Sequence, residues 1–128
     1  MADKKDLIAK INAAALDVGG KLKADKRNLQ QNYNYISADK SLSVLGQALF
    51  TAGVAVVPSV TSVTTVETQM GETKRRYDTT VELLMLLTDG ESDLTLVWRG
   101  MGSDYSTPDK AMYKAITSGH KYFLLKLL

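Results

Sequence analysis

The stretch that decides the fold class is residues 77–98, which read YDTTVELLMLLTDGESDLTLVW. Apolar side chains occupy every second position over residues 81–87 and again over 94–98. Alternation with a period of two is typical of strands that bury one face, and Asp89-Gly90 between the runs is typical of a two-residue hairpin turn. The stretch therefore predicts an antiparallel hairpin.

A two-residue turn pairs the apolar residues of both strands on one face, which a helix must cover. The expected pairs are Val81 with Trp98, Leu83 with Leu96 and Met85 with Leu94. The opposite face mixes polar residues with Leu84, Leu86 and Val97. Because that is more apolar surface than solvent alone should meet, a second layer or a subunit interface is expected there.

Two helices are predicted before the hairpin. Apolar residues recur at helical spacing over residues 7–18, and Gly19-Gly20 supplies a stop. The second helix has Ser37 as its N-cap, Asp39 in its first turn and Gly53 as its end.

The segments beside the second helix are expected to be loop or strand. Residues 21–32 are polar and aperiodic and predict a loop, which leads into a short extended segment over 33–36. Residues 54–70 are rich in Val and Thr and predict a strand. Pro58 cannot donate a ladder hydrogen bond, so this strand is expected to be irregular, at an edge or with a bulge.

The last segment is predicted to be a loop over 100–105 and then a helix, since Thr107 can cap and Pro108 suits the first helical position. The expected fold class is α+β, with N-terminal helices and an antiparallel three-stranded meander covered by a C-terminal helix. A length of 128 residues favours one domain over 1–128.

The predicted C-terminal helix carries a stripe of cations. At about 100° per residue, Lys121 and Lys114 lie about 20° and 40° from Lys110, and Thr117 and Ser118 flank them. The opposite side is an apolar face for the sheet, made by Met112, Ala115, Ile116, Gly119 and Phe123. Lys110 and Lys121 would lie about 16 Å apart, enough to reach two or three phosphates of an extended strand.

Overall composition bounds the class without naming a ligand. A hydrophobic fraction of 45% and a charged fraction of 23% exclude disordered, collagenous and membrane proteins, and a net charge of +2 is too small to indicate nucleic acid by itself. Cysteine is absent. Without a spanning apolar run or a signal-peptide core, a cytoplasmic protein without membrane partners is expected.

The chain resembles the ERF family of phage recombination proteins, whose signature joins a Tyr-x-Tyr segment to a terminal pattern of Asp, Asp-Lys-Ala, Lys-Ala, Thr and Lys-Tyr. The matching residues are Tyr33-Asn34-Tyr35-Ile36-Ser37, Gly53-Val54-Ala55-Val56-Val57-Pro58, Gly100, Gly102, Asp104, Asp109-Lys110-Ala111, Lys114-Ala115, Thr117 and Lys121-Tyr122. The resemblance covers roughly residues 5–125. Gly119-His120 departs from it, and the family's C-terminal extension has no counterpart here.

The resemblance implies a fold similar to that of eukaryotic single-strand annealing recombinases. It also implies assembly into a homo-oligomeric ring or filament, and annealing of single-stranded DNA into a duplex intermediate without ATP, any cofactor or a catalytic site. A host single-strand-binding protein is a further expected partner in phage recombination and DNA repair.

Other cations complete the expected DNA site. Arg99 and Lys74-Arg75-Arg76 are expected to form the opposite wall of a groove, the alternative being exposed strand-end charges. Lys26-Arg27 beside Tyr33 and Tyr35 offers rings that could stack bases, the alternative being buried tyrosines.

Three alternatives to this site remain open. The lysine stripe could be a solvated helix face, although no acid follows Asp109 on that helix. The acids Asp78, Glu82, Asp104 and Asp109 could belong to a metal-dependent nuclease, but a Pro-Asp-Lys that opens a helix does not fit that arrangement. The chain could also be a structural or interaction domain that binds no DNA.

Overall fold

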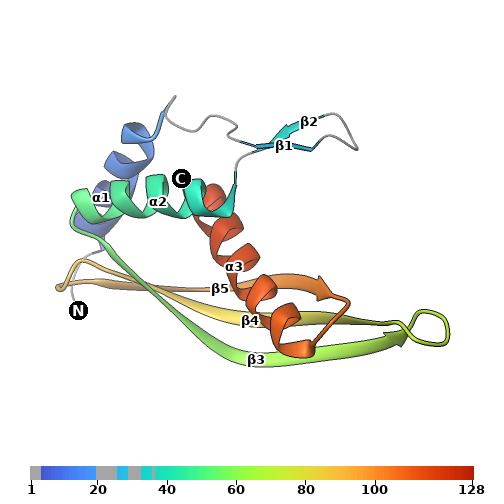
Figure 1. The fold of residues 1–128 in the computed structure, drawn as a ribbon. Coiled ribbons are helices and arrows are strands. Elements are labelled where there is room, and N and C mark those ends of the chain that lie inside the picture. Colours follow the sequence, from blue (N-terminus) through green and yellow to red (C-terminus); the bar gives the residue numbers. More distant parts are fainter. Residues whose placement is uncertain (1–3, 20–25, 29–32, 36) are drawn as a thin grey trace. The chain divides into compact units, whose positions relative to one another are not determined.

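The computed structural model describes residues 4–19, 26–28, 33–35 and 37–128. Their elements, in order, are α1 (Lys5–Asp17), β1 (Lys26–Asn28), β2 (Tyr33–Tyr35), α2 (Ala38–Thr51), β3 (Ala55–Gln69), β4 (Arg75–Thr88), β5 (Asp93–Asp104) and α3 (Pro108–Leu127). Figure 1 shows that β3, β4 and β5 form one sheet with α3 on one of its faces. The predicted α+β class, with two N-terminal helices and an antiparallel three-stranded sheet covered by a C-terminal helix, is confirmed.

The chain divides into two compact units. The first comprises residues 1–56, 87–94 and 123–128, and the second comprises 57–86 and 95–122. In the first unit α1 packs on α2, and the residues buried on these helices are almost all apolar. They are Leu7, Ala14 and Val18 at α1, and Ser41, Leu45, Ala48 and Leu49 on α2.

The ends of α2 follow the expected local chemistry. The Ser37 Oγ accepts a hydrogen bond from the Lys40 N–H at 3.2 Å, which satisfies one of the unpaired donors of the first turn. Gly53, just past the last turn, has a φ of 86°, a conformation that glycine adopts without a steric penalty. Both predicted boundaries are confirmed.

One prediction in the first unit is wrong. Lys26–Asn28, expected within a loop, forms β1 and pairs antiparallel with β2, with Lys26 opposite Tyr35 and Asn28 opposite Tyr33. A strand of three residues is too short to show a period of two in the sequence. The rest of the predicted loop, and Ile36 of the predicted extended segment, lie outside the described residues.

The β4–β5 turn is wider than the predicted two residues. The Asp89 N–H donates to the Ser92 carbonyl at 3.3 Å, and the Asp89 Oδ1 accepts the N–H groups of Glu91 and Ser92 at 3.0 and 2.8 Å. These side-chain bonds stabilise a four-residue turn, in which Gly90 takes a φ of 93°.

The wider turn shifts the pairing of the whole hairpin. The hydrogen bond between Asp89 and Ser92 sets a register for the two strands. The contacts of Glu82 with Arg99 and of Asp78 with Ser103 agree with that register. In the expected pairs each β5 residue was therefore two positions too early along the strand, although on the same face. These contacts indicate that Val81 pairs with Gly100, Leu83 with Trp98 and Met85 with Leu96.

The face assignment itself is confirmed. Val81, Leu83 and Met85 of β4 are fully buried, whereas Leu84 and Val97 of the other face are exposed. No second layer covers that other face within the part of the second unit that the structure describes.

The strand β3 is an edge strand that changes face once. Its Thr65 hydroxyl bonds to that of Thr79, a residue of the buried face, at 2.9 Å. Its Thr61 hydroxyl donates at 3.0 Å to Glu82, a residue of the open face. Residues four apart in a regular strand share a face, so the two contacts indicate a one-residue bulge between Thr61 and Thr65. Pro58 lies on this edge strand, as its missing N–H requires.

Candidate functional site

The candidate site is the outer face of α3 in the second unit. The helix begins at Pro108 directly after Thr107, as predicted. Its inner face is made of small residues, of which Ala111, Ala115 and Gly119 are buried. The approach to the sheet is close, since a Cβ added to Gly119 would lie 2.8 Å from the Leu83 Cδ1 and 3.0 Å from the Gly100 Cα.

The residues that face this contact were expected in a loop. Gly100–Asp104 is instead the end of β5, and a Cβ on Gly102 would lie 2.5 Å from the Ala115 nitrogen and 2.8 Å from the Ala111 oxygen. Glycine in a strand often marks a close backbone approach, and here the approaching element is α3. The glycines therefore set the position of the site.

The structure places the predicted stripe on the side of α3 away from the sheet. Lys110, Lys114 and Thr117 are exposed, and Ser118 and Lys121 are half-buried. The Lys121 ammonium lies 5.2 Å from the centre of the Tyr122 ring, a cation–π distance. The stripe is thus one continuous surface of cations and hydroxyl groups.

Lys114 is held in place by the end of β5. Its Nζ donates to the Asp104 Oδ1 at 2.8 Å and to the Ser103 carbonyl at 3.1 Å. The Lys114 side chain is 57% exposed, whereas that of Asp104 is 9% exposed. An ammonium has three donors, so Lys114 keeps one that can reach a ligand.

Asp104 orders the turn into α3. Its Oδ2 accepts the N–H groups of Ser106 and Thr107 at 2.8 and 3.1 Å. The Lys114 ammonium, followed by these two N–H groups, holds the pKa of Asp104 far below its usual range. Asp104 therefore orders the turn that leads into α3.

Tyr113 was missed by the sequence analysis although it lies in the same stripe. It follows Lys110 by three residues and precedes Thr117 by four, so the three are neighbours on the helix surface. Its side chain is 60% exposed. The helical wheel that identified the lysines places Tyr113 about 40° from Thr117, and that spacing was the available signal.

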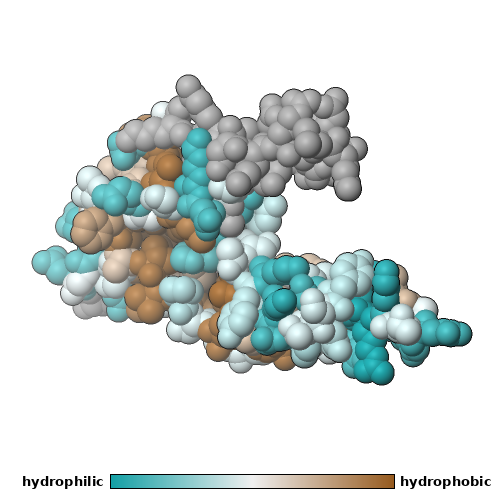
Figure 2. All heavy atoms as spheres, in the orientation of Figure 1, coloured by the Kyte–Doolittle hydropathy of each residue, from teal (hydrophilic) through white to brown (hydrophobic). Residues whose placement is uncertain are grey.

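The predicted second wall is not brought to α3. Arg99 pairs at 3.9 Å with Glu82 on the sheet face opposite the helix. Arg75 pairs with Glu67 at 2.8 Å, and Arg76 with Asp78 at 2.9 Å. These two arginines, with Lys74, lie at the β3–β4 turn, over which Figure 2 shows hydrophilic residues gathering.

The predicted stacking group belongs to the other unit. Lys26, Arg27, Tyr33 and Tyr35 are residues of β1 and β2, where Lys26 and Tyr35 are register partners.

Three of the four acids of the nuclease alternative, Asp78, Glu82 and Asp104, have other partners. The Ser103 hydroxyl and Arg76 both bond to Asp78, with the hydroxyl the larger cause of its lowered pKa. Glu82 accepts from Thr61, and Asp104 from Lys114. Within residues 4–19, 26–28, 33–35 and 37–128, no three His, Cys, Asp or Glu residues are grouped so that they could hold a metal ion.

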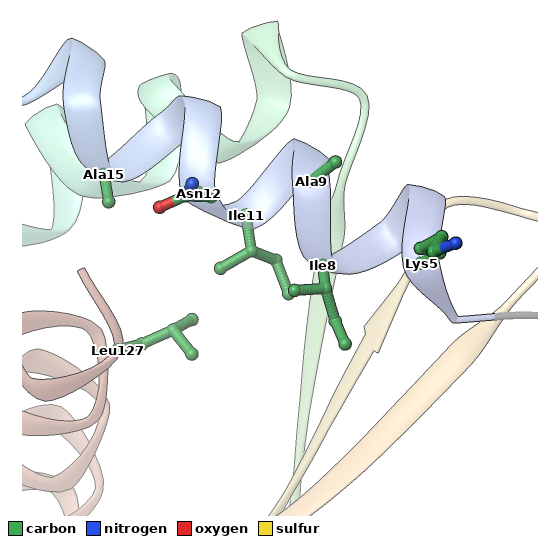
Figure 3. Close-up of a pocket in the computed structure, with 7 residues that line it drawn as sticks. All are labelled: Lys5, Ile8, Ala9, Ile11, Asn12, Ala15 and Leu127. Atoms are coloured by element: carbon green, nitrogen blue, oxygen red, sulfur yellow. The ribbon is translucent and has the colours of Figure 1, made fainter.

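A shallow apolar groove of about 360 Å³ lies in the first unit. Its lining is Lys5, Ile8, Ala9, Ile11, Asn12 and Ala15 of α1, together with Leu127 (Figure 3). Figure 3 shows Ile8, Ile11 and Leu127 projecting into the same space. One ammonium and one amide among apolar side chains do not make a catalytic or metal-binding group.

Comparisons with known proteins add no assignment to this geometry. No family model matches the chain, and no curated protein matches it. Among the described residues, no helix is long and apolar enough to span a membrane. The resemblance to the ERF family therefore depends on the quoted motifs alone.

Proposed function

We propose that this chain binds single-stranded DNA without nucleotide hydrolysis and anneals complementary strands, with the outer face of α3 as its DNA contact. The observation that carries the proposal is the stripe of Lys110, Lys114, Thr117 and Lys121, which contains no acid and in which all but the half-buried Lys121 are exposed. The resemblance to the ERF family supports the annealing step, assembly into a ring or filament and a role in phage recombination.

The stripe suits a ligand held by its backbone. Lysines and hydroxyl groups bond to phosphates and leave the base edges free, as annealing requires. Lys114 contributes an ammonium whose position is fixed by Asp104, so little side-chain freedom is lost when a phosphate binds. Lys110 and Lys121 lie about three helical turns apart, which spreads the contact over several phosphates.

The test is binding of a fluorescent oligo-dT to the full chain, followed by anisotropy over a range of salt concentrations. Each phosphate contact to a single strand adds about 0.7 to the log–log salt slope, so three lysines should contribute about 2. Replacing Lys110, Lys114 and Lys121 by Ala should remove that contribution and most of the affinity.

A matched control removes the same charge from the first unit, by replacing Lys4, Lys5 and Lys126 with Ala. These residues are exposed and belong to the other unit. The control should retain the slope of the unmodified chain. If both variants lose affinity equally, general charge and not the stripe binds DNA, and salt-insensitive or absent binding by the unmodified chain would refute the proposal.

Annealing is measured separately, with two complementary strands that carry a fluorophore and a quencher. Acceleration of duplex formation without ATP, lost in the triple variant at unchanged protein concentration, is the expected result. A chain that binds oligo-dT but leaves the annealing rate unchanged would be a single-strand-binding protein only.

A further inference from the structure

Three exposed tyrosines lie in α3 or in the turn before it, but they differ in their contacts. The pKa of the Arg76 guanidinium is raised by Asp78 and, to a smaller extent, by Tyr105. The Tyr122 ring has the Lys121 ammonium 5.2 Å from its centre. For Tyr113, 60% exposed, no hydrogen bond or ring contact is found among the described residues.

An exposed ring without a partner is available to a ligand. Tyrosine presents a large apolar face with few rotatable bonds, so covering that face releases water at a small entropic cost. The bases of a single strand have such faces exposed, whereas the bases of a duplex are already stacked on each other. Tyr113 is therefore suited to single strands in particular.

The neighbours of Tyr113 add charge complementarity. Lys110 is one helical turn before it and Thr117 one turn after it, each about 5–6 Å away between Cβ atoms. A phosphate held by Lys110 would leave the attached base beside the Tyr113 ring. Cation, ring and hydroxyl thus match the phosphate, base and backbone of one extended strand.

We infer that Tyr113 stacks on an unpaired base of the bound strand, so that the stripe selects single-stranded DNA over duplex DNA. The inference rests on the proposed function, because it takes the stripe as the DNA contact. Tyr113 then contributes the part of the affinity that depends on bases, and the lysines contribute the part that depends on phosphates.

The test compares Tyr113→Leu, which removes the ring, with Tyr113→Phe, which keeps the ring and removes the hydroxyl. The probes are a fluorescent oligo-dT, an abasic oligomer of the same length and a duplex. Tyr113→Leu should weaken oligo-dT binding roughly 5- to 100-fold, the usual effect of losing one base–aromatic stack. Tyr113→Phe should bind oligo-dT like the unmodified chain, and neither variant should change binding of the abasic oligomer.

The outcomes separate the inference from the proposed function. If the unmodified chain binds oligo-dT and Tyr113→Leu binds it equally well, or if abasic and oligo-dT strands bind alike, Tyr113 does not stack and the stripe still binds DNA. If the unmodified chain binds none of the probes, the proposed function fails. Circular dichroism of both variants should match the unmodified chain, since the side chain is exposed.

Discussion

The two faces of α3 are built from opposite kinds of residue. The inner face has Ala111, Ala115 and Gly119, whose backbone approaches Gly100 and Gly102 of β5. The outer face has long, exposed side chains such as Lys110 and Tyr113. Within the second unit, α3 therefore approaches β5 closely through small residues.

This difference separates stability from binding on one helix. Changes on the inner face should alter the free energy of unfolding, and changes on the outer face should alter affinity for DNA. One contact links binding to stability, because Lys114 of the outer face pairs with Asp104 at the end of β5. Substitutions on each face of α3 can therefore test this separation.

The largest effect is expected from Gly102→Ala on the inner side. The added methyl would lie 2.5 Å from the Ala115 nitrogen and 2.8 Å from the Lys114 carbonyl carbon, both backbone atoms that cannot rotate away. We expect a loss of roughly 3 kcal/mol or more in the free energy of unfolding, since α3 must move off the sheet. Urea denaturation followed by circular dichroism measures it.

The matched control is Gly46→Ala in α2, where nothing lies within 4 Å of the added methyl. Alanine is favoured over glycine inside a helix by about 1 kcal/mol, so this variant should be more stable than the unmodified chain. The same substitution would then lower the free energy of unfolding at Gly102 and raise it at Gly46. Equal, small effects at both would show that α3 does not pack tightly on β5.

An intermediate loss of stability is expected at low pH, where the carboxylates of Asp104 and Asp89 become protonated. Each carboxylate accepts two backbone N–H groups and pairs with a lysine, Lys114 or Lys10. Hydrogen bonds from Ser92, Glu91 and Lys10 lower the pKa of Asp89 to about 2, and the pKa of Asp104 is lowered too. A carboxylate whose pKa is lowered on folding stabilises the fold at pH values above its unfolded pKa of about 4. This stabilisation is lost as the pH falls toward the folded pKa.

Urea midpoints at pH 6 and pH 3 measure this loss. The unmodified chain should be less stable at pH 3, and Asp104→Asn should show a smaller difference between the two values, because amide side chains do not titrate. Asp104→Asn should also be less stable at pH 6, since its pairing with Lys114 is gone. An unchanged pH difference would mean that Asp104 keeps its ordinary pKa in the folded chain.

The sequence was sufficient to predict those helices and strands whose residue pattern repeats over several turns or strand pairs. The buried positions of β4, the ends of α2 and the orientation of the α3 lysines all follow from local period and capping. What failed depended on contacts between distant residues. Gly100 and Gly102 look like loop residues in sequence, and only the approach of α3 explains them as strand.

The candidate site shows the same limit. Arg99 was predicted to line a groove with the last helix, and its pairing with Glu82 on the opposite face of the sheet could not be known without the register of the hairpin. That register depends on the Asp89 turn, which is fixed by its own hydrogen bonds and by Lys10 of α1. Tyr113 was missed for a different reason, since its position on the helical wheel lies between the cationic stripe and the apolar face.

The smallest changes in stability are expected on the outer face of α3, where they differ from one side chain to the next. Lys110→Ala and Thr117→Ala remove exposed side chains and should each change the free energy of unfolding by no more than about 0.5 kcal/mol. Lys114→Ala should destabilise more than either, because it leaves the nearly buried Asp104 carboxylate without its cation. Thermal melts of the three variants at pH 7 measure the ranking. If Lys114→Ala is as neutral as Lys110→Ala, the pair with Asp104 adds no stability, and the two faces of α3 are independent without exception.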